Sequence, residues 1–295
     1  MREITYEIDE RHDGMQVGAF LRGRGFSRAV LTRLKQGDRL KCNGSHIRTV
    51  DTVKTGDVVS VAFDDRSETF PNPDLKADVV YDDDDIVVFD KPANMPVHTS
   101  IWHGNDTLAN LFAALYPDSY FHSVGRLDKD TSGLVTIAKN KIAACVLMTT
   151  GDKRPEKVYY AVTDRGFADS CGTEGEIIAP IAREKDDYMR RIVREDGEYA
   201  HTKYRVIRST GKYCLSEISL VTGRTHQIRV HFAYMGFPLI GDELYGGDTS
   251  VLKRHALHCG KLFLRQPVTG AEISLSSPLP EDMESLFDES QKERS

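Results

Sequence analysis

Residues 125–133 read Gly-Arg-Leu-Asp-Lys-Asp-Thr-Ser-Gly and stand directly before an apolar run at 134–138 that is typical of a buried strand. The stretch is polar and has a glycine at each end, so it predicts a loop that a sheet holds in place. An Arg-Leu-Asp tripeptide alone is typical of an ordinary solvated turn. The carboxylate of Asp128 becomes a candidate for chemistry only through the other stretches that accompany it.

Short β-type runs and fewer helical patterns surround this loop. The runs typical of strands are 86–89, 134–138, 158–163, 202–208, 213–221, 256–264 and 272–275. Helical spacing of apolar residues occurs at 107–115, 141–150 and 225–235. Because the helices interrupt a strand-rich chain irregularly, we expect an α+β fold with a mixed, mainly antiparallel sheet.

The N-terminal part has a different pattern. Apolar residues at helical spacing in 15–36 are interrupted by Gly23 and Gly25, which predicts two short helices, and strands are expected at 39–42 and 58–63. We therefore predict a small α/β module at 1–70, a linker at 71–78, a larger domain at 79–282 and an acidic C-terminal tail at 283–295.

Composition excludes several classes of protein. The five cysteines among 295 residues are widely scattered and form no Cys-x-x-Cys pair, which argues against a disulfide lattice, a zinc site and a Cys-His hydrolase. No apolar run is long enough for a membrane span, and the first residues lack the apolar stretch of a secretory signal. We expect a cytoplasmic protein that does not enter a membrane.

Charge is distributed unevenly along the chain. The formal net charge is -6, yet residues 22–48 hold eight Lys or Arg side chains against Asp38 alone. Such a cluster is typical of a surface that binds phosphates. From 64 to 90 the balance reverses, and we interpret the acidic run 82–85 as a solvated turn.

The basic stretch resembles a known RNA-binding module. Phe26-Ser-Arg-Ala-Val30, the run from Lys35 to Gly44 and Lys54-Thr-Gly-Asp-Val-Val-Ser-Val61 are similar to the S-four-type RNA-binding domain over about residues 13–63. The resemblance implies that the second helix and the following turn present basic side chains to RNA. These would be Arg24, Arg28, Arg33 and Lys35, the alternative being surface cations without a ligand.

The larger part resembles the RluA-type pseudouridine synthases. Besides 125–133, four blocks occur in the order that this family shows, namely Asp90–His98, Lys157–Ala161, Thr222–His231, and Gly241–Gly246 followed by Leu257-His258. The resemblance spans about residues 79–280. Five ordered blocks are far more specific than any single one, so we expect the pseudouridine synthase fold here.

The resemblance implies a reaction and its partners. The family detaches uracil from its ribose, turns it and rejoins it through a ring carbon, without a cofactor or a metal. The partner would be structured RNA, with large-subunit ribosomal RNA favoured over transfer RNA, and we expect a monomer. Asp128 would be the essential carboxylate, acting either as nucleophile on the sugar carbon or as base on a sugar proton.

The resemblance also implies roles for other residues. Arg126 would enter the space left by the flipped-out base. Tyr159 would stack on the uracil, whereas Tyr160 would point to the opposite face of its strand because side chains alternate. Arg224 is predicted to form the ion pair that keeps Asp128 charged and oriented.

The remaining site residues are expected around this centre. Leu257 and Ile228 would line the uracil pocket, and Lys91 and His226 would face RNA. His226 and His231 are five residues apart and do not share a helical face as metal ligands would. Trp102, without motif support, is interpreted as a packing residue. The alternative function is a non-catalytic RNA-binding or ribosome-assembly factor, against which Asp128, Tyr159 and Arg224 together argue.

Overall fold

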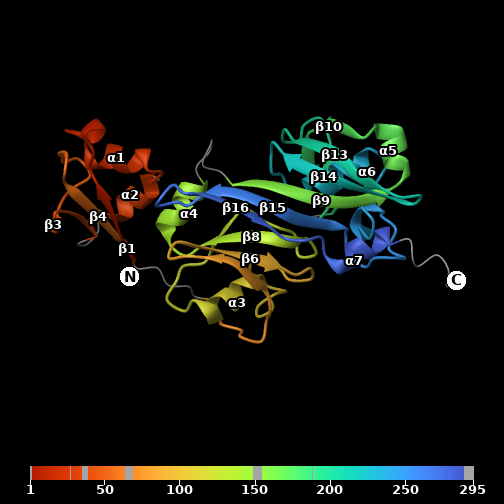
Figure 1. Ribbon diagram of the computed structural model, residues 1–295, viewed down its shortest axis with the longest axis horizontal. Coiled ribbons are helices and arrows are strands. Elements are labelled where there is room, and N and C mark those ends of the chain that lie inside the picture. Colours follow the sequence, from red (N-terminus) through yellow and green to blue (C-terminus); the bar gives the residue numbers. More distant parts are fainter. Residues whose placement is uncertain are drawn as a thin grey trace.

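The computed structural model describes residues 2–26, 28–34, 39–63, 69–148, 155–187 and 189–288. A four-stranded and a ten-stranded sheet organise these residues (Figure 1). In the larger sheet the strand pairings are antiparallel except for one parallel pair, β8 with β15. This mixed sheet, with helices packed on it, confirms the predicted α+β class.

The smaller sheet and two helices form what we call the N-terminal module. Its strands, in spatial order, are β1 (Arg2–Glu7), β4 (Val58–Phe63), β2 (Leu40–Cys42) and β3 (Ser45–His46). The helices are α1 (Val17–Gly23) and α2 (Arg28–Leu34), with a 3-10 turn η1 (Glu10–His12). Sequence analysis missed β1, although Ile4 and Tyr6 are buried and alternate with exposed residues as in a half-buried strand.

The N-terminal module packs against the larger part through helix α4 (Lys141–Met148). Ile142 and Val146 of this helix belong to the same buried cluster as Phe20 and Leu34 of the module. Gly25 has a φ of +97°, and a Cβ there would lie 3.1 Å from Val146. Apolar burial therefore joins the two sheets, in addition to the chain that connects them.

The larger sheet follows the order β10-β13-β14-β9-β15-β8-β6-β5, with β16 beside β15 and β7 beside β8. Its strands are β5 (Asp78–Asp82), β6 (Ile86–Lys91), β7 (His122–Val124), β8 (Ser132–Ala138), β9 (Glu156–Asp164), β10 (Glu174–Ile178), β13 (His201–Ser209), β14 (Tyr213–Leu220), β15 (Leu257–Arg265) and β16 (Glu272–Ser276).

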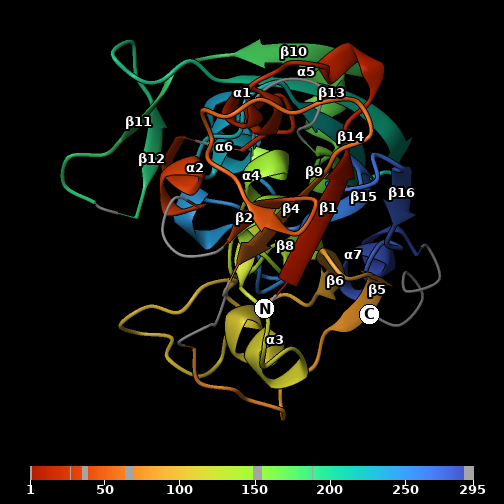
Figure 2. The same cartoon turned by 90° about the vertical axis from the view of Figure 1, so that its left-hand side faces the viewer.

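Short helices and one hairpin complete this part. The helices are α3 (Leu108–Leu115), α5 (Gly166–Cys171), α6 (Gln227–Tyr234) and α7 (Glu281–Glu284), with 3-10 turns η2 (Glu243–Tyr245) and η3 (Ser285–Phe287). The hairpin of β11 (Ile181–Arg183) and β12 (Arg191–Val193) projects away from the sheet in Figure 2. None of the helices in the described ranges is long and apolar enough to cross a membrane.

Strand β8 lies inside the larger sheet between β15 and β6, and every one of its residues is buried. Its first residues pair in parallel with β15, where Gly133 lies opposite Cys259. Gly133 has a φ of +106°, and a Cβ there would lie 2.3 Å from the carbonyl oxygen of Cys259. A glycine is therefore needed where the loop at 125–131 enters β8.

Two expectations about charged segments are corrected by burial. The run 82–85 does form the turn between β5 and β6, but Asp85 is only 2% exposed and accepts hydrogen bonds from Asn140 (2.9 Å) and Gln266 (3.0 Å). The predicted tail from residue 283 begins inside the fold, because Met283 and Phe287 are buried against Tyr213 and its neighbours.

Trp102 was expected to pack inside the fold but lies at the surface. Its side chain is 84% exposed at the tip of the loop between β6 and α3, so the interpretation as a packing residue was wrong. Neighbouring Ile101 is 91% exposed.

Candidate active site

Asp128 lies on the loop that joins β7 to β8. The two strands pair in antiparallel fashion, with Val124 opposite Thr136, so the loop is the closed end of a hairpin whose second strand is the buried strand β8. The main-chain oxygen of Asp128 accepts a bond from the Thr131 amide at 3.2 Å. The Asp128 side chain keeps 28% exposure, so a substrate can reach it.

Side chains from other elements hold the loop immediately after Asp128. Each binds a different loop residue. Lys91 donates to the Lys129 carbonyl at 3.0 Å, Arg254 donates to the Asp130 carbonyl at 3.4 Å, and His255 is hydrogen-bonded to the Thr131 hydroxyl at 2.8 Å. A carboxylate on a loop tied at three successive residues is pre-organised, which is what positional catalysis requires.

Arg229 of helix α6 connects Asp128 to a second carboxylate, Asp242. Its Nη1 donates to Asp128 Oδ2 at 3.1 Å, while Nε and Nη2 form a paired contact with Asp242 at 2.7 and 2.8 Å. Asp242 is fully buried, and the Arg229 side chain is 8% exposed. The two carboxylates raise the pKa of Arg229 despite its burial, so the guanidinium stays charged.

His226 approaches the same carboxylate oxygen from another side. Its Nε2 lies 3.7 Å from Asp128 Oδ2, and its Nδ1 lies 3.0 Å from the Tyr245 hydroxyl. Burial lowers the pKa of His226, an effect that the Asp128 charge only partly offsets. The imidazole is therefore mainly neutral at pH 7.

The environment keeps Asp128 ionised. Burial by itself raises the pKa of a carboxyl, but here the charges of His226 and Arg229, together with the Arg229 hydrogen bond, outweigh burial. The resulting pKa of Asp128 is below its ordinary value. At neutral pH His226 is mainly uncharged, so Arg229 is the residue whose charge still lowers the pKa of Asp128.

An apolar layer lies beside the loop. Leu127, Tyr159, Ile228 and Leu257 belong to one buried cluster, and each is less than a tenth exposed. Tyr160 packs in a different cluster on the opposite face of β9, as its alternation with Tyr159 predicts. The residues expected to surround a uracil thus belong to the same buried core as the residue that precedes Asp128.

Arg224 does not make the predicted ion pair with Asp128. Its Nη1 pairs with Glu198 at 2.7 Å, and its Nε donates to the Tyr199 carbonyl at 3.0 Å. The block 222–231 contains two arginines, and helix α6 begins only at Gln227, so Arg224 precedes the helix whereas Arg229 lies on its buried face. The prediction was wrong because the sequence does not show which of the two arginines contacts Asp128.

Lys91 does not face RNA either. Its side chain is fully buried, and Nζ donates to the carbonyls of Pro92 and Lys129 at 2.8 and 3.0 Å. Arg126, by contrast, is exposed, and its guanidinium donates to the Thr225 hydroxyl at 2.7 Å. Arg126 and Asp128 therefore lie on one loop, with the arginine open to solvent.

Sequence reasoning missed several contributors to the site, among them Arg229, Asp242, Arg254 and His255. Arg229 and Asp242 lay inside the quoted blocks. Because a buried arginine needs a carboxylate partner, a search of these blocks for such a pair could have found them. His255 carried no sequence signal, because its contact with Thr131 joins residues 124 positions apart. Among the described residues, no group of three or more His, Cys, Asp or Glu is placed to hold a metal ion.

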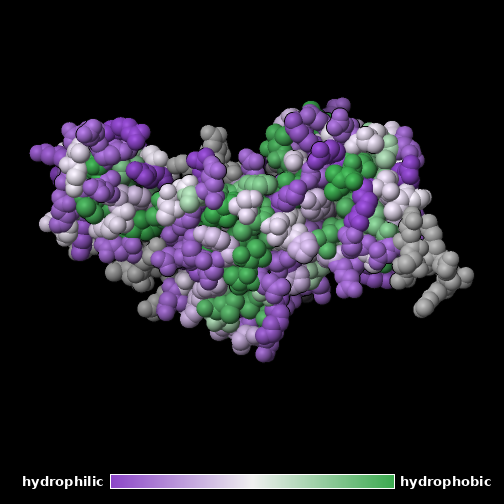
Figure 3. All heavy atoms as spheres, viewed as in Figure 1, coloured by the Kyte–Doolittle hydropathy of each residue, from purple (hydrophilic) through white to green (hydrophobic). Residues whose placement is uncertain are grey.

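The basic side chains of the N-terminal module are only partly accessible. Arg24 is half-buried, with its guanidinium 5.4 Å from the ring centre of Tyr6 and 5.1 Å from that of Phe20. Arg28 is exposed, whereas Lys35 and the side chain of Arg33 lie outside the described part of the chain. Hydrophilic residues predominate on the face of the module seen in Figure 3.

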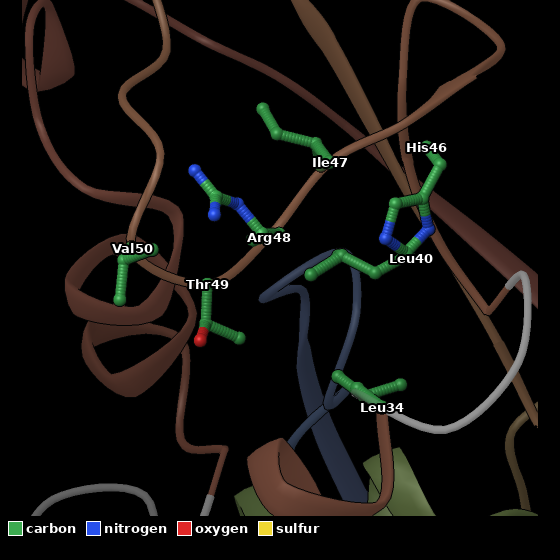
Figure 4. A pocket seen from close by; sticks show the side chains of 7 residues that line it. All are labelled: Leu34, Leu40, His46, Ile47, Arg48, Thr49 and Val50. Carbon is green, nitrogen blue, oxygen red and sulfur yellow. The ribbon is translucent and has the colours of Figure 1, made fainter.

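A pocket of about 320 Å³ also lies in this module, not at Asp128 (Figure 4). It is lined by Leu34, Leu40, His46, Ile47, Arg48, Thr49 and Val50.

Comparisons with known proteins show what this chain is similar to. The model of the RNA pseudouridylate synthase family matches residues 85–234. Ribosomal large subunit pseudouridine synthase D of Xanthomonas campestris is 37% identical over 284 residues, covering 89% of this chain and 84% of the relative. The uncharacterized RNA pseudouridine synthase YjbO of Bacillus subtilis is 34% identical over 270 residues, covering 89% of this chain and 95% of the relative.

A solved structure shares the fold. Human RNA pseudouridylate synthase domain containing 1 has a TM-score of 0.57 at 23% identity, covering 70% of this chain and 85% of that one.

The buried Lys91 should make stability depend on pH. Burial lowers the pKa of Lys91 to about 7, so between pH 7 and the ordinary lysine value the unfolded chain binds more protons than the folded one. The free energy of unfolding of the native protein should therefore rise over this range relative to that of Lys91→Met. Urea titrations of both proteins at several pH values test this, and parallel pH curves would contradict it.

Proposed function

Since the chain belongs to the RNA pseudouridylate synthase family, we propose that it isomerises specific uridines of large-subunit ribosomal RNA and that Asp128 is the essential carboxylate. The observation that carries the role of Asp128 is its position on the tied loop, ionised, partly exposed and bound by Arg229. The preference for ribosomal RNA rests on the name of the Xanthomonas relative.

The geometry suits either chemical role of the carboxylate. Attack on the sugar carbon and removal of a sugar proton both need an ionised carboxylate at neutral pH. The charge of Arg229 helps to keep Asp128 in this ionised form. Arg229 and His226 both approach Oδ2. Oδ1 is therefore the oxygen of Asp128 that these two residues leave for the ribose.

Base flipping would use the residues around the loop. A uridine stacked in structured RNA must leave its stack to reach Asp128, at a cost of a few kcal/mol. We assign Arg126 to the space left by the base, because it is exposed on the same loop and a guanidinium can both stack and donate hydrogen bonds. Tyr159, Ile228 and Leu257 would then form the apolar side of the uracil pocket.

The N-terminal module would add affinity for the RNA backbone. Arg22 and Arg28 are exposed cations on α1 and α2 and are free to approach phosphates. The packing of the module on α4 keeps these cations at a defined place relative to the larger sheet. We therefore assign the module the role of an S-four-type RNA-binding domain.

Asp128→Asn should abolish turnover while leaving RNA binding intact. The new glycosidic bond replaces the hydrogen on a uracil ring carbon, so isomerisation of RNA carrying tritium at that carbon releases the isotope. We expect release by the variant to fall by at least ~10³-fold, as for other essential catalytic groups. Asp130→Asn, two residues along the same loop, is the control and should keep most of the activity. Absence of release by the native protein on ribosomal and transfer RNA would favour a non-catalytic RNA-binding factor instead.

Exchanging each arginine of the 222–231 block for lysine should separate their roles. Arg229→Lys keeps the charge but loses the paired contact with Asp242, so Asp128 is misplaced and turnover should fall by about 10²-fold. Arg224→Lys alters a partly exposed pair with Glu198 and should change turnover far less. Tritium release under single-turnover conditions measures both, and an equal loss in the two variants would count against Arg229 as the partner of Asp128.

Removing exposed cations from the N-terminal module should flatten the salt dependence of RNA binding. For Arg22→Gln combined with Arg28→Gln, the slope of log K against log salt should decrease in magnitude by roughly 1.4 to 1.8, the loss of two phosphate contacts. Arg48→Gln is the matched control, because Arg48 already pairs with Asp51 at 2.8 Å. Binding titrations at several salt concentrations measure the slope, and an unchanged slope in the double variant would contradict the assignment.

A further inference from the structure

Tyr245 contacts His226 and Arg229, the two residues that approach the carboxylate of Asp128. It ends the turn η2, which directly follows Asp242, and its side chain is buried. Its hydroxyl accepts a hydrogen bond from the backbone amide of Arg191 at 3.0 Å and lies 3.0 Å from Nδ1 of His226. The guanidinium of Arg229 lies 5.0 Å from the centre of its ring.

The hydrogen bonds of this hydroxyl determine where the proton of His226 lies. The oxygen already accepts from the Arg191 amide, and its own single proton needs an acceptor. The Nδ1 lone pair of His226 is an acceptor at hydrogen-bond distance. A neutral imidazole that accepts at Nδ1 carries its proton on Nε2, because only one ring nitrogen is protonated.

The opposite ring nitrogen faces the candidate catalytic carboxylate. His226 Nε2 is 3.7 Å from Asp128 Oδ2. An N–H group directed at a carboxylate oxygen attracts it, whereas the other tautomer would direct a lone pair at the negative charge. Only the Nε2–H form therefore supports Asp128 in the orientation that its bond to Arg229 defines.

We propose that Tyr245 is a positioning residue, whose hydroxyl holds His226 in the Nε2–H tautomer so that Oδ2 of Asp128 is fixed and Oδ1 is left for the substrate ribose. The inference rests on the proposed role of Asp128 in isomerisation. Its geometric part, the tautomer of His226, can be measured without any substrate.

The residues around Tyr245 hold its hydroxyl in one position. Its ring packs in a small buried cluster with Ile181 of β11 and Val230 of α6, and Val193 of β12 packs against this cluster. His226 has a φ of +58°, a left-handed conformation in which the ring enters the site just before α6 begins. Because the Arg191 contact is made by the backbone, it survives any change of the Arg191 side chain.

The tautomer is tested by NMR of protein labelled with nitrogen-15 in its histidines. The His226 signals are identified by their absence from the His226→Asn variant, which suits the left-handed conformation at this position. In the native protein at pH 8 we expect a protonated Nε2 and an unprotonated Nδ1, and in Tyr245→Phe we expect a mixture of tautomers. A protonated Nδ1 in the native protein, or an unchanged ratio in Tyr245→Phe, would overturn the proposal whether or not the protein isomerises uridine.

Kinetics test whether the tautomer matters for the reaction. Tyr245→Phe should lower kcat for tritium release by roughly tenfold with KM nearly unchanged, a smaller loss than the ~10⁴-fold that a wrong tautomer costs a proton-transferring histidine. His226→Asn should lose a similar factor, and the double variant should lose no more than the worse single one, because Tyr245 acts through His226. Multiplying losses, or a change in KM instead of kcat, would overturn the role.

A matched control shows whether loss of a buried tyrosine hydroxyl is harmful by itself. The Tyr204 hydroxyl donates to the Cys171 carbonyl at 2.7 Å, outside the Asp128 site. Tyr204→Phe should keep kcat near that of the native protein. If Tyr204→Phe lowers kcat as much as Tyr245→Phe does, the loss reflects general stability, and the proposal fails.

Discussion

The guanidinium of Arg229 between the carboxylates of Asp242 and Asp128 is the contact on which the rest of the site depends. Burying these charges is costly, and the attraction among them compensates only when the hydrogen-bond geometry is good. Both oxygens of Asp242 are used by Arg229, which leaves Nη1 for Asp128. We interpret this arrangement as a device for positioning and for keeping Asp128 charged, more than as a source of stability.

Several remote segments must meet for this contact to form. Arg229 and Asp128 are 101 residues apart. The loop of Asp128 is continuous with β8, an interior strand of the sheet, whereas Arg229 comes from helix α6. Gly133 allows β8 to approach the backbone of β15, and the chain just before β15 supplies Arg254 and His255 to the same loop. The strand pairings of the larger sheet thus decide where the carboxylate lies.

Much of the fold could be predicted from the sequence because regular elements leave a periodic pattern. The alternation in β9 correctly separated Tyr159 from Tyr160, and the apolar spacing at 107–115 located α3 within one residue. Some short segments were missed, including β1 despite its alternation of buried and exposed residues. The strands of the β11–β12 hairpin are only three residues long, which is too short to show a period, and β12 packs against α6.

The sequence motifs of the site could be predicted, but the contacts between its side chains could not. The motifs placed Asp128 and Arg126 on one loop. They did not predict the burial of Lys91, whose Nζ donates to two backbone carbonyls. The choice between Arg224 and Arg229 depends on which arginine contacts Asp128, a residue 101 positions away in the chain. Tertiary contacts of this kind, like the one between His226 and Tyr245, are not revealed by any local pattern.

The most direct test of the account is the titration of the Asp128 carboxyl followed by carbon-13 NMR, with the signal identified by its absence in Asp128→Asn. We predict that the pKa of Asp128 lies below the ordinary aspartate value in the native protein and rises in Arg229→Lys, where the paired contact that directs Nη1 to Oδ2 is lost. A native pKa at or above the ordinary value, or one that is the same in the two proteins, would contradict the claim that Arg229 keeps this carboxylate charged.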